Sequence, residues 1–117
     1  MSSCASSEPF ALQVTDNSME PEFPDKCIII IDPFPEAGDG AFVVAEYDDV
    51  RWFRQFRIID GRRYLMALND LYPEIELVED YTILGLVVQR NVRRKIKHYP
   101  MGLLAETAEE RNQVSLN

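Results

Sequence analysis

The sequence predicts a single, mostly β domain, and three observations carry that prediction. The apolar runs are short and rich in β-branched and aromatic residues, which favour strands. Turn-forming residues (Asp, Asn, Gly and Pro) separate these runs at near-regular spacing, as in antiparallel domains. The chain has 117 residues, 46% of them apolar, which suits one domain and leaves no room for a second.

Six strands are expected in chain order. They cover Phe10–Val14, Cys27–Ile31, Ala41–Tyr47, Val50–Ile59, Arg63–Leu68 and Tyr81–Gln89. Asp60-Gly61 lies between the fourth and fifth of these strands. It predicts a hairpin there, because Asp-Gly is favoured in two-residue turns. Good helix formers over Gly102–Asn112 predict a short C-terminal helix or a frayed tail. We therefore expect a flexible leader over residues 1–9, the domain over 10–100 and a helix or tail over 101–117.

The formal net charge of −8 argues against nucleic acid as the primary ligand. The charge is unevenly spread, since residues 1–50 are strongly acidic whereas 51–63 and 90–97 form basic bands. The band at 90–97 is either a solvated tail or a contact for phosphates, an acidic partner or the acidic half of a second copy. No apolar stretch is long enough to span a bilayer and the first residues do not resemble a signal peptide, so a cytoplasmic location is expected.

The sequence contains few of the residues that usually bind metals or cofactors. The two cysteines, Cys4 and Cys27, are far apart, which is not the close pairing that metal sites use. His98 is the one histidine, so a histidine-based triad or zinc site is not expected. We predict neither a metal nor a cofactor.

The predicted strand Val50–Ile59 places a charge where an apolar side chain is expected. Because side chains alternate between the faces of a strand, Trp52, Arg54, Phe56 and Ile58 share one face. Arg54 thus lies among large apolar neighbours, and a buried guanidinium needs an acidic partner or a specific role. The alternatives are an edge strand, an arginine whose head reaches solvent, or a bulge that shifts the alternation.

Four sequence blocks follow one another in an order that is informative about the family of the protein. They are residues 10–25 with Ser18-Met19, the turn Gly38-Asp39-Gly40 before an apolar strand, Leu65–Ile75, and the strand Ile83–Val88. This series resembles the LexA-like serine peptidases, the family of LexA and phage repressor C-terminal domains and of UmuD-like chains. The resemblance covers about residues 10 to 90. It implies a compact, mostly β fold of the kind that signal peptidases share.

The resemblance implies a Ser–Lys dyad, in which a neutral lysine removes the proton of the serine hydroxyl. Ser18 matches the nucleophile, although a serine in such a cluster is also an ordinary turn residue. The lysine position reads Arg54, and arginine cannot act as a base because it does not lose its proton in proteins. By their spacing, Lys26, Lys95 and Lys97 are poorly placed to replace it.

Two further departures from the family pattern point the same way. Only residues 1–17 precede Ser18, which leaves no room for the family's self-cleavage loop. Asp16 stands where the family usually has glycine, close to where an oxyanion would form. Asp16 or Asp25 is therefore expected to pair with Arg54 and close the site.

We therefore expect a LexA/UmuD-like peptidase domain with weak or no activity, with Ser18 and Arg54 as its site residues. The alternative is a non-catalytic, homodimerising module that binds a partner in a stress or DNA-damage response. A signal-peptidase-like enzyme is a distant third, because that reaction normally implies a membrane anchor. The expected partners are a second copy and a protein or peptide, with no membrane and no DNA-binding domain, since no helix-turn-helix pattern precedes residue 10.

Overall fold

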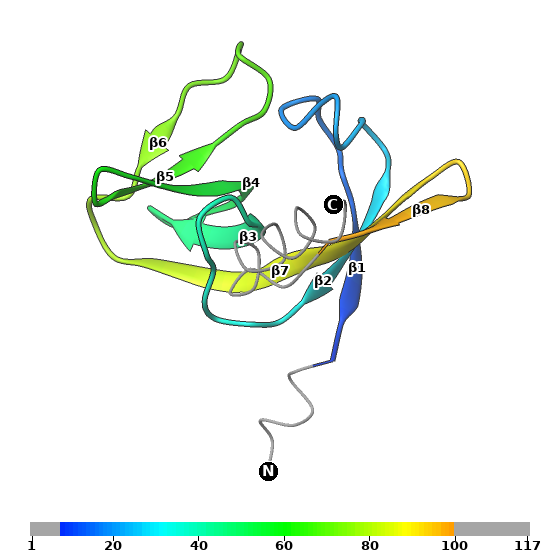
Figure 1. The fold of residues 1–117 in the computed structure, drawn as a ribbon, viewed down its shortest axis with the longest axis horizontal. Helices are drawn as coiled ribbons and strands as arrows, with labels where there is room; N and C mark the ends of the chain where they lie inside the picture. Colours follow the sequence, from blue (N-terminus) through cyan, green and yellow to red (C-terminus); the bar gives the residue numbers. More distant parts are fainter. Residues whose placement is uncertain (1–7, 100–117) are drawn as a thin grey trace, which may run out of the picture.

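The protein is described from a computed structural model, which describes residues 8–99. These residues form eight strands and no helix (Figure 1). In chain order the strands are β1 (Phe10–Gln13), β2 (Ile28–Asp32), β3 (Phe42–Tyr47), β4 (Val50–Ile59), β5 (Arg62–Met66), β6 (Ile75–Glu76), β7 (Tyr81–Val92) and β8 (Lys95–His98). The mostly β fold predicted from the sequence is confirmed. The helix predicted over Gly102–Asn112 lies outside the described residues.

The strands form one antiparallel sheet in the order β1-β2-β7-β3-β4-β5-β6, and β8 pairs with the far end of β7. The twelve-residue β7 organises this sheet, because it pairs with β3 over residues 81–86 and with β2 over residues 86–91, while β8 pairs with residues 89–92 on the edge opposite β2. Two register shifts, between Ile30 and Ile31 of β2 and between Val44 and Ala45 of β3, interrupt its ladders. Such bulges bend and twist a sheet, so the strands curl around the body of the domain (Figure 1).

Tight turns join three of the antiparallel pairs. As predicted, Asp60 and Gly61 connect β4 to β5, and both have positive φ (54° and 79°). Asp48-Asp49 and Arg93-Arg94 make the same kind of turn between β3 and β4 and between β7 and β8. Two central residues with positive φ define the turn that matches the twist of a hairpin. The third hairpin was not expected, because the sequence predicted that β7 would end at Gln89.

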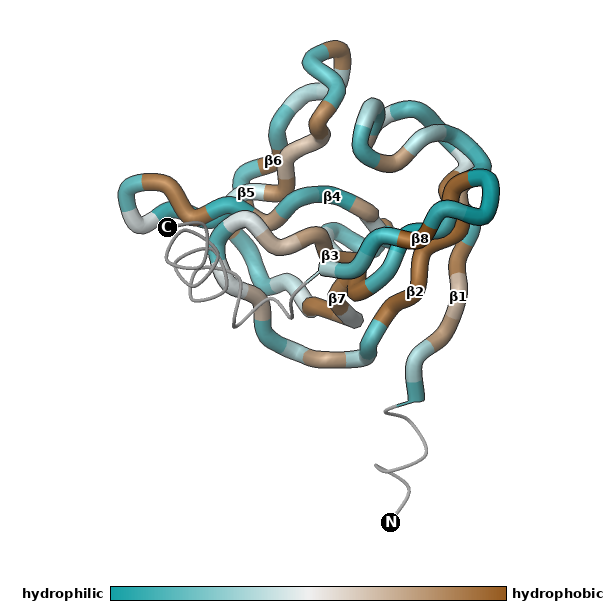
Figure 2. The backbone as a smooth tube through the Cα atoms, turned by 45° about the vertical axis from the view of Figure 1, so that its right-hand side comes forward, coloured by the Kyte–Doolittle hydropathy of each residue, from teal (hydrophilic) through white to brown (hydrophobic). Residues whose placement is uncertain are grey.

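The sheet is packed on both faces. One buried cluster consists of Val14, Met19, Phe23, Cys27, Ile29, Ile31, Val44 and Val87. A second consists of Ala41, Val43, Ala45, Phe56, Leu65, Ile83 and Leu86. Neighbouring residues such as Leu86 and Val87 contribute to different clusters, which explains why β2, β3 and β7 read as nearly continuous apolar runs. Figure 2 shows the hydrophobic stretches of β2 and β7 within the fold.

No helix in the described part of the chain has the length and apolar character needed to cross a membrane.

Candidate functional site

The connection between β1 and β2 places Ser18 inside the protein. The β1–β2 ladder is extended by hydrogen bonds from the Val14 amide to the Cys27 carbonyl (2.9 Å) and from the Lys26 amide to the Val14 carbonyl (2.6 Å). The intervening chain folds back over the sheet and fully buries Met19 and Phe23 in the first apolar cluster. Ser18, next to Met19, is only 1% exposed. A serine in an ordinary surface turn would not be buried in this way.

Strand β4 brings Arg54 to the same point. Arg54 pairs with Val43 of β3 and is 7% exposed, so the alternation predicted from the sequence is correct and Arg54 lies on the buried face with Phe56. Its Nη1 donates hydrogen bonds to Ser18 Oγ over 2.9 Å and to the Phe53 carbonyl over 2.8 Å. The two residues that the sequence singled out are therefore in direct contact.

Asp16 completes a chain of three polar groups. Its Oδ1 accepts hydrogen bonds from the Ser18 backbone amide (3.1 Å) and from Ser18 Oγ (2.8 Å). The Ser18 hydroxyl thus donates a hydrogen bond to Asp16 and accepts one from Arg54. Among the described residues, no carboxylate forms a direct ion pair with Arg54. Of the two partners expected from the sequence, Asp16 reaches Arg54 through the serine, whereas Asp25 hydrogen bonds through its amide to Glu20.

Two aromatic rings flank the arginine. The Arg54 Cζ lies 5.2 Å from the ring centroid of Trp52 and 5.6 Å from that of Tyr72, within range of a cation–π interaction. Burial lowers the pKa of the guanidinium, while Asp16 and Tyr72 oppose that shift. Arginine stays protonated even so, because its ordinary pKa is far above neutral. Its buried Nε has no hydrogen-bond partner among residues 8–99, so the guanidinium is held mainly by one hydroxyl, one carbonyl and the two rings.

The segment after β5 fixes the serine turn from the other side. The Asn69 amide donates to the Ser18 carbonyl and its Nδ2 donates to the Asn17 carbonyl, each over 3.0 Å. The Tyr72 hydroxyl donates to Asn17 Oδ1 over 2.7 Å. Asn69 and Tyr72 were not among the site residues expected from the sequence. Their signal was their presence in the block Leu65–Ile75, which lies far from Ser18 in the sequence and beside it in the fold.

A small hollow opens beside the serine. Its volume is about 270 Å³, and its walls include Leu12, Val14, Asp16, Ser18, Trp52 and Arg54. It lies where β1 and the first half of β4 face each other. In the sheet, β5 pairs with β4 only from Gln55 onward, so residues 50–54 have one free edge. A hollow of this size is slightly below the about 300–1,000 Å³ of typical small-molecule pockets.

No lysine replaces the missing base among the described contacts. Lys26 occupies the turn before β2 with a φ of 78°, and Lys97 of β8 binds Glu22 at 2.6 Å. The hydrogen bonds of Ser18 Oγ go to Arg54 and Asp16 instead. The site therefore holds a serine hydroxyl between a cation, which cannot accept its proton, and a carboxylate, which accepts a hydrogen bond from it.

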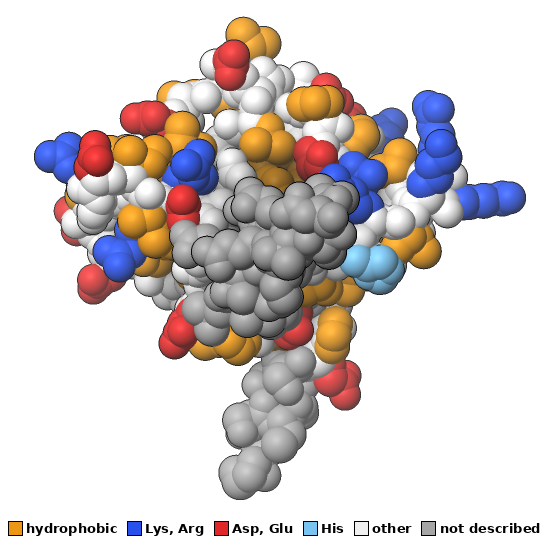
Figure 3. All heavy atoms as spheres, in the orientation of Figure 1, with side chains coloured by type: hydrophobic (Ala, Val, Ile, Leu, Met, Phe, Trp, Pro, Cys, Tyr) orange, Lys and Arg blue, Asp and Glu red, His pale blue; other side chains and the backbone are white. Residues whose placement is uncertain are grey.

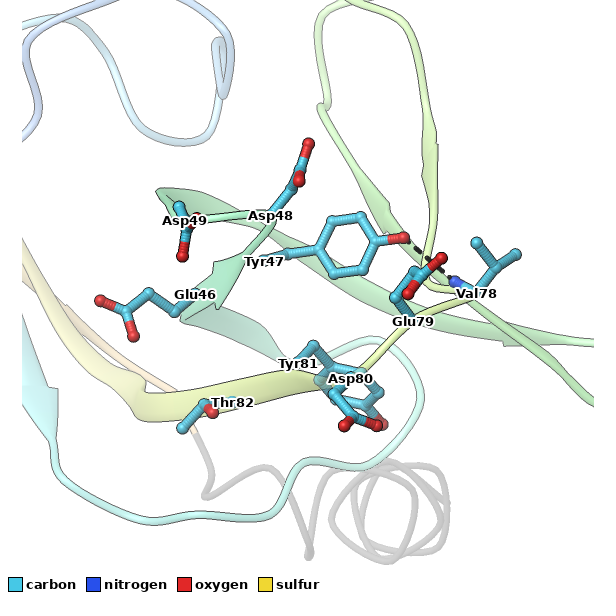
Figure 4. A pocket seen from close by; sticks show the side chains of 9 residues that line it. All are labelled: Glu46, Tyr47, Asp48, Asp49, Val78, Glu79, Asp80, Tyr81 and Thr82. Carbon is cyan, nitrogen blue, oxygen red and sulfur yellow. Dashed lines mark hydrogen bonds between the residues drawn. The ribbon is translucent and has the colours of Figure 1, made fainter.

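A larger hollow at the other end of β3 is acidic and lies apart from Ser18 (Figure 4). Its volume is about 710 Å³, and Glu46, Asp48, Asp49, Glu79 and Asp80 line it. Figure 4 shows these carboxylates pointing in different directions around Tyr47, whose hydroxyl accepts a hydrogen bond from the Val78 amide. Within residues 8–99, no group of three or more His, Cys, Asp or Glu side chains is arranged to hold a metal ion.

The antiparallel sheet, with a buried serine in the β1–β2 turn facing a basic residue of β4, defines a domain of the LexA-like serine peptidase type. The chain belongs to the Peptidase S24-like family, whose sequence model matches residues 2–88. The family resemblance seen in the sequence is thereby confirmed.

The similar proteins include regulators of transcription. The HTH-type transcriptional regulator for conjugative element R391 from Providencia rettgeri is 39% identical over 88 residues, which cover 68% of this chain and 40% of that protein. The regulator for conjugative element SXT from Vibrio cholerae gives the same values. Repressor protein C2 of Salmonella phage P22 is 35% identical over 89 residues, covering 71% of this chain and 41% of that protein. The chain thus spans about two fifths of the length of these relatives.

Proposed function

We propose that this chain is a peptidase-fold domain without peptidase activity, which serves a transcriptional regulator by self-association. One observation carries the first half of this proposal: Ser18 Oγ accepts a hydrogen bond from Arg54 and donates a hydrogen bond to Asp16. The names of the relatives support the second half, because they are regulators of transcription rather than polymerase accessory proteins.

The chemistry of the hydroxyl supports inactivity. A serine becomes a nucleophile when a neighbouring base removes its proton. The neighbour in the family's lysine position is a guanidinium, which has no lone pair available to accept one. Asp16 accepts a hydrogen bond from the Ser18 hydroxyl, but a carboxylate is too weak a base to remove the proton of an alcohol efficiently at neutral pH. Its negative charge would also oppose the oxyanion that forms when a peptide carbonyl is attacked.

Burial supports the same conclusion. Ser18 is 1% exposed, and the hydrogen bonds from Asn69 and Tyr72 fix its turn from the outside. Although Ser18 borders the small hollow beside β1, a side chain that is 1% exposed offers almost no surface to a peptide carbonyl. We therefore propose a structural role for Ser18 and Arg54: together they join the β1–β2 turn to β4.

The surface of the domain has features that could bind a second copy or another protein. Large apolar side chains remain exposed at several places, among them Leu71 (86%) and Val78 (71%) next to β6, and Ile58 and Ile59 at the end of β4. The first half of β4 also keeps a free edge, which is the usual place for strand addition. We propose a homodimer in the cytoplasm that acts with a DNA-binding regulator.

A cleavage assay that compares the unaltered chain with three variants tests the proposal. The unaltered chain, Ser18→Ala, Arg54→Lys and Asp16→Gly/Arg54→Lys are incubated at alkaline pH, alone and with denatured protein as substrate. We expect no cleavage by the first two and Ser18-dependent cleavage by the double variant, since it supplies a base and removes the opposing charge. Arg57→Lys is the matched control, because Arg57 lies on the same strand and pairs with Asp39 away from Ser18.

Two results would overturn the proposal. Cleavage by the unaltered chain that disappears in Ser18→Ala would show an active peptidase. Sedimentation equilibrium that finds only monomers up to high micromolar concentration would remove self-association, while leaving the absence of activity standing.

A further inference from the structure

The β7–β8 hairpin forms a basic arm at one end of the molecule. Arg93 and Arg94 make its turn with φ of 50° and 71°, and Val92 pairs with Lys95 across it. All of residues 93–98 are exposed. Figure 1 shows this hairpin extending from the body of the sheet, and Figure 3 shows Lys and Arg side chains gathered at that end. The arm thus carries cations far into solvent.

The strand register places several of these cations on one face. Arg90 and Val92 of β7 lie opposite Lys97 and Lys95 of β8, so all four side chains point to the same side of the ribbon. The turn before β2 covers the base of that side and adds Lys26. Between them lies a hollow of about 840 Å³. It is lined by Pro24, Asp25, Lys26, Cys27, Ile28, Arg90, Asn91, Val92, Arg93 and Lys95.

The positive charge around this hollow is poorly compensated. The Glu22 carboxylate is already occupied by Lys97 (2.6 Å) and Arg90 (3.4 Å). Lys26, Arg93 and Lys95 form no ion pair within the described part of the chain. Asp25 is the one carboxylate in the lining. The buried Arg90 Nε also has no hydrogen-bond partner among residues 8–99. Four cations around one hollow repel each other, and an anion placed between them relieves that repulsion.

We propose that this hollow, on one face of the hairpin, binds the phosphates of a nucleic acid backbone. A two-stranded ribbon fits a groove of duplex DNA, and its exposed arginines and lysines then reach the flanking phosphates. An acidic protein is the weaker candidate, because the centres of protein interfaces are enriched in aromatic anchors and none of the described lining residues is aromatic. This contact goes beyond the proposed function and does not depend on the state of Ser18.

The salt dependence of binding tests the proposal. Fluorescence anisotropy follows the binding of the chain to a short labelled DNA duplex of arbitrary sequence over a range of salt concentrations. Each neutralised phosphate contributes about −0.9 to the slope of log K against log salt concentration, so contacts from Lys26, Arg93 and Lys95 predict a slope of about −3. The double variant Arg93→Ala/Lys95→Ala should bring the slope to about −1.

The matched control is Arg62→Ala/Arg63→Ala. It removes the same charge from exposed residues next to the β4–β5 turn, so its slope should stay near that of the unaltered chain. All variants are first compared by circular dichroism. In the unaltered chain, amide NMR signals of residues 93–97 and of Lys26 should shift during titration with DNA, which gives a readout that needs no substitution.

Three outcomes would overturn the proposal. The first is the absence of binding even at low salt, and the second is an equal loss of slope in both double variants, which would reflect net charge alone. The third is competition by a polyglutamate peptide as effective as that by DNA at equal charge, which would assign the arm to acidic proteins.

Discussion

The Arg54 guanidinium donates a hydrogen bond to the Ser18 hydroxyl over 2.9 Å, across 36 positions of the sequence. This contact joins two parts of the fold that the sheet does not connect directly, because β4 is separated from β1 by three other strands. The same hydroxyl donates to Asp16, so a cation and an anion share one buried serine. Such a bridge withdraws the hydroxyl from chemistry, because its hydrogen and one of its lone pairs are already engaged in hydrogen bonds.

Ser18→Ala should destabilise the protein by about 1–3 kcal/mol, because it leaves a buried guanidinium hydrogen without its acceptor. The substitution also removes the hydrogen bond from the Ser18 hydroxyl to Asp16. It thereby weakens the attachment of the serine turn, whose backbone carbonyl accepts a hydrogen bond from Asn69. Denaturant unfolding followed by tryptophan fluorescence measures it, since Trp52 lies beside Arg54.

The control for this prediction is Thr15→Ala, which removes an exposed hydroxyl three residues earlier. Its effect should stay within about 0.5 kcal/mol. If Ser18→Ala unfolds at the same denaturant concentration as Thr15→Ala, the bridge contributes nothing measurable and the structural role of Ser18 is wrong.

The position of Arg54 could be predicted because it depends on a simple period. Alternation along β4 placed it on the face of Phe56, and the structure has both residues buried. The Asp60-Gly61 hairpin was predictable for a similar reason, since these residue types favour positive φ.

Other features had no such local signal. Arginine is not a residue that favours positive φ, so nothing in Arg93-Arg94 indicated a hairpin turn, and β8 was missed. Asn69 and Tyr72 hydrogen bond to Asn17, the neighbour of Ser18, from more than fifty positions away. Contacts of that kind depend on how strands are ordered in the sheet, which period and propensity do not specify.

Acid should destabilise the protein through Glu22. Burial alone would raise the pKa of this carboxyl, but hydrogen bonds from Lys97 and Tyr99 and the charge of Arg90 lower it below its ordinary value of 4.5. A lowered pKa in the folded state means that the stabilisation is fully present above pH 4.5 and is lost as the pH falls through the folded-state value. The free energy of unfolding, measured between neutral pH and pH 3, should therefore fall at the acid end.

Glu22→Gln isolates this contribution. It should cost about 1.5–3 kcal/mol at neutral pH, where charged hydrogen bonds are lost, and should flatten the acid limb of the profile. Glu46→Gln is the comparison, because its pair with Arg51 is long (4.0 Å) and exposed and should contribute less than about 1 kcal/mol. An acid limb that persists unchanged in Glu22→Gln would exclude Glu22 as its source.

Gly85→Ala should destabilise the centre of the sheet. A Cβ built on Gly85 would collide with the Ile31 side chain and lie 2.8 Å from the Asp32 carbonyl oxygen, near the point where the pairing of β7 with β2 ends. Because the obstacle includes backbone, we expect a loss of about 1–3 kcal/mol in the free energy of unfolding. Thr82→Ala, at an exposed position of the same strand, should change it by no more than about 0.5 kcal/mol. Equal melting temperatures for the two variants would contradict this packing.

Asp49→Gly should stabilise the protein. Asp49 holds a φ of 62° in the β3–β4 turn, at the position that Gly61 occupies in the β4–β5 turn. A side chain in this left-handed region costs about 1 kcal/mol, whereas glycine adopts it freely. Asp49 also lines the acidic hollow on the same side as Glu46, so removing its charge has an effect of its own (Figure 4). Asp49→Asn separates the two causes, because it removes the charge and keeps the side chain. In thermal unfolding, the melting temperature of Asp49→Gly should exceed that of Asp49→Asn. Gly61→Asp should lower the free energy of unfolding by an amount similar to the gain in Asp49→Gly. Equal melting temperatures for Asp49→Asn and Asp49→Gly would assign the whole effect to charge.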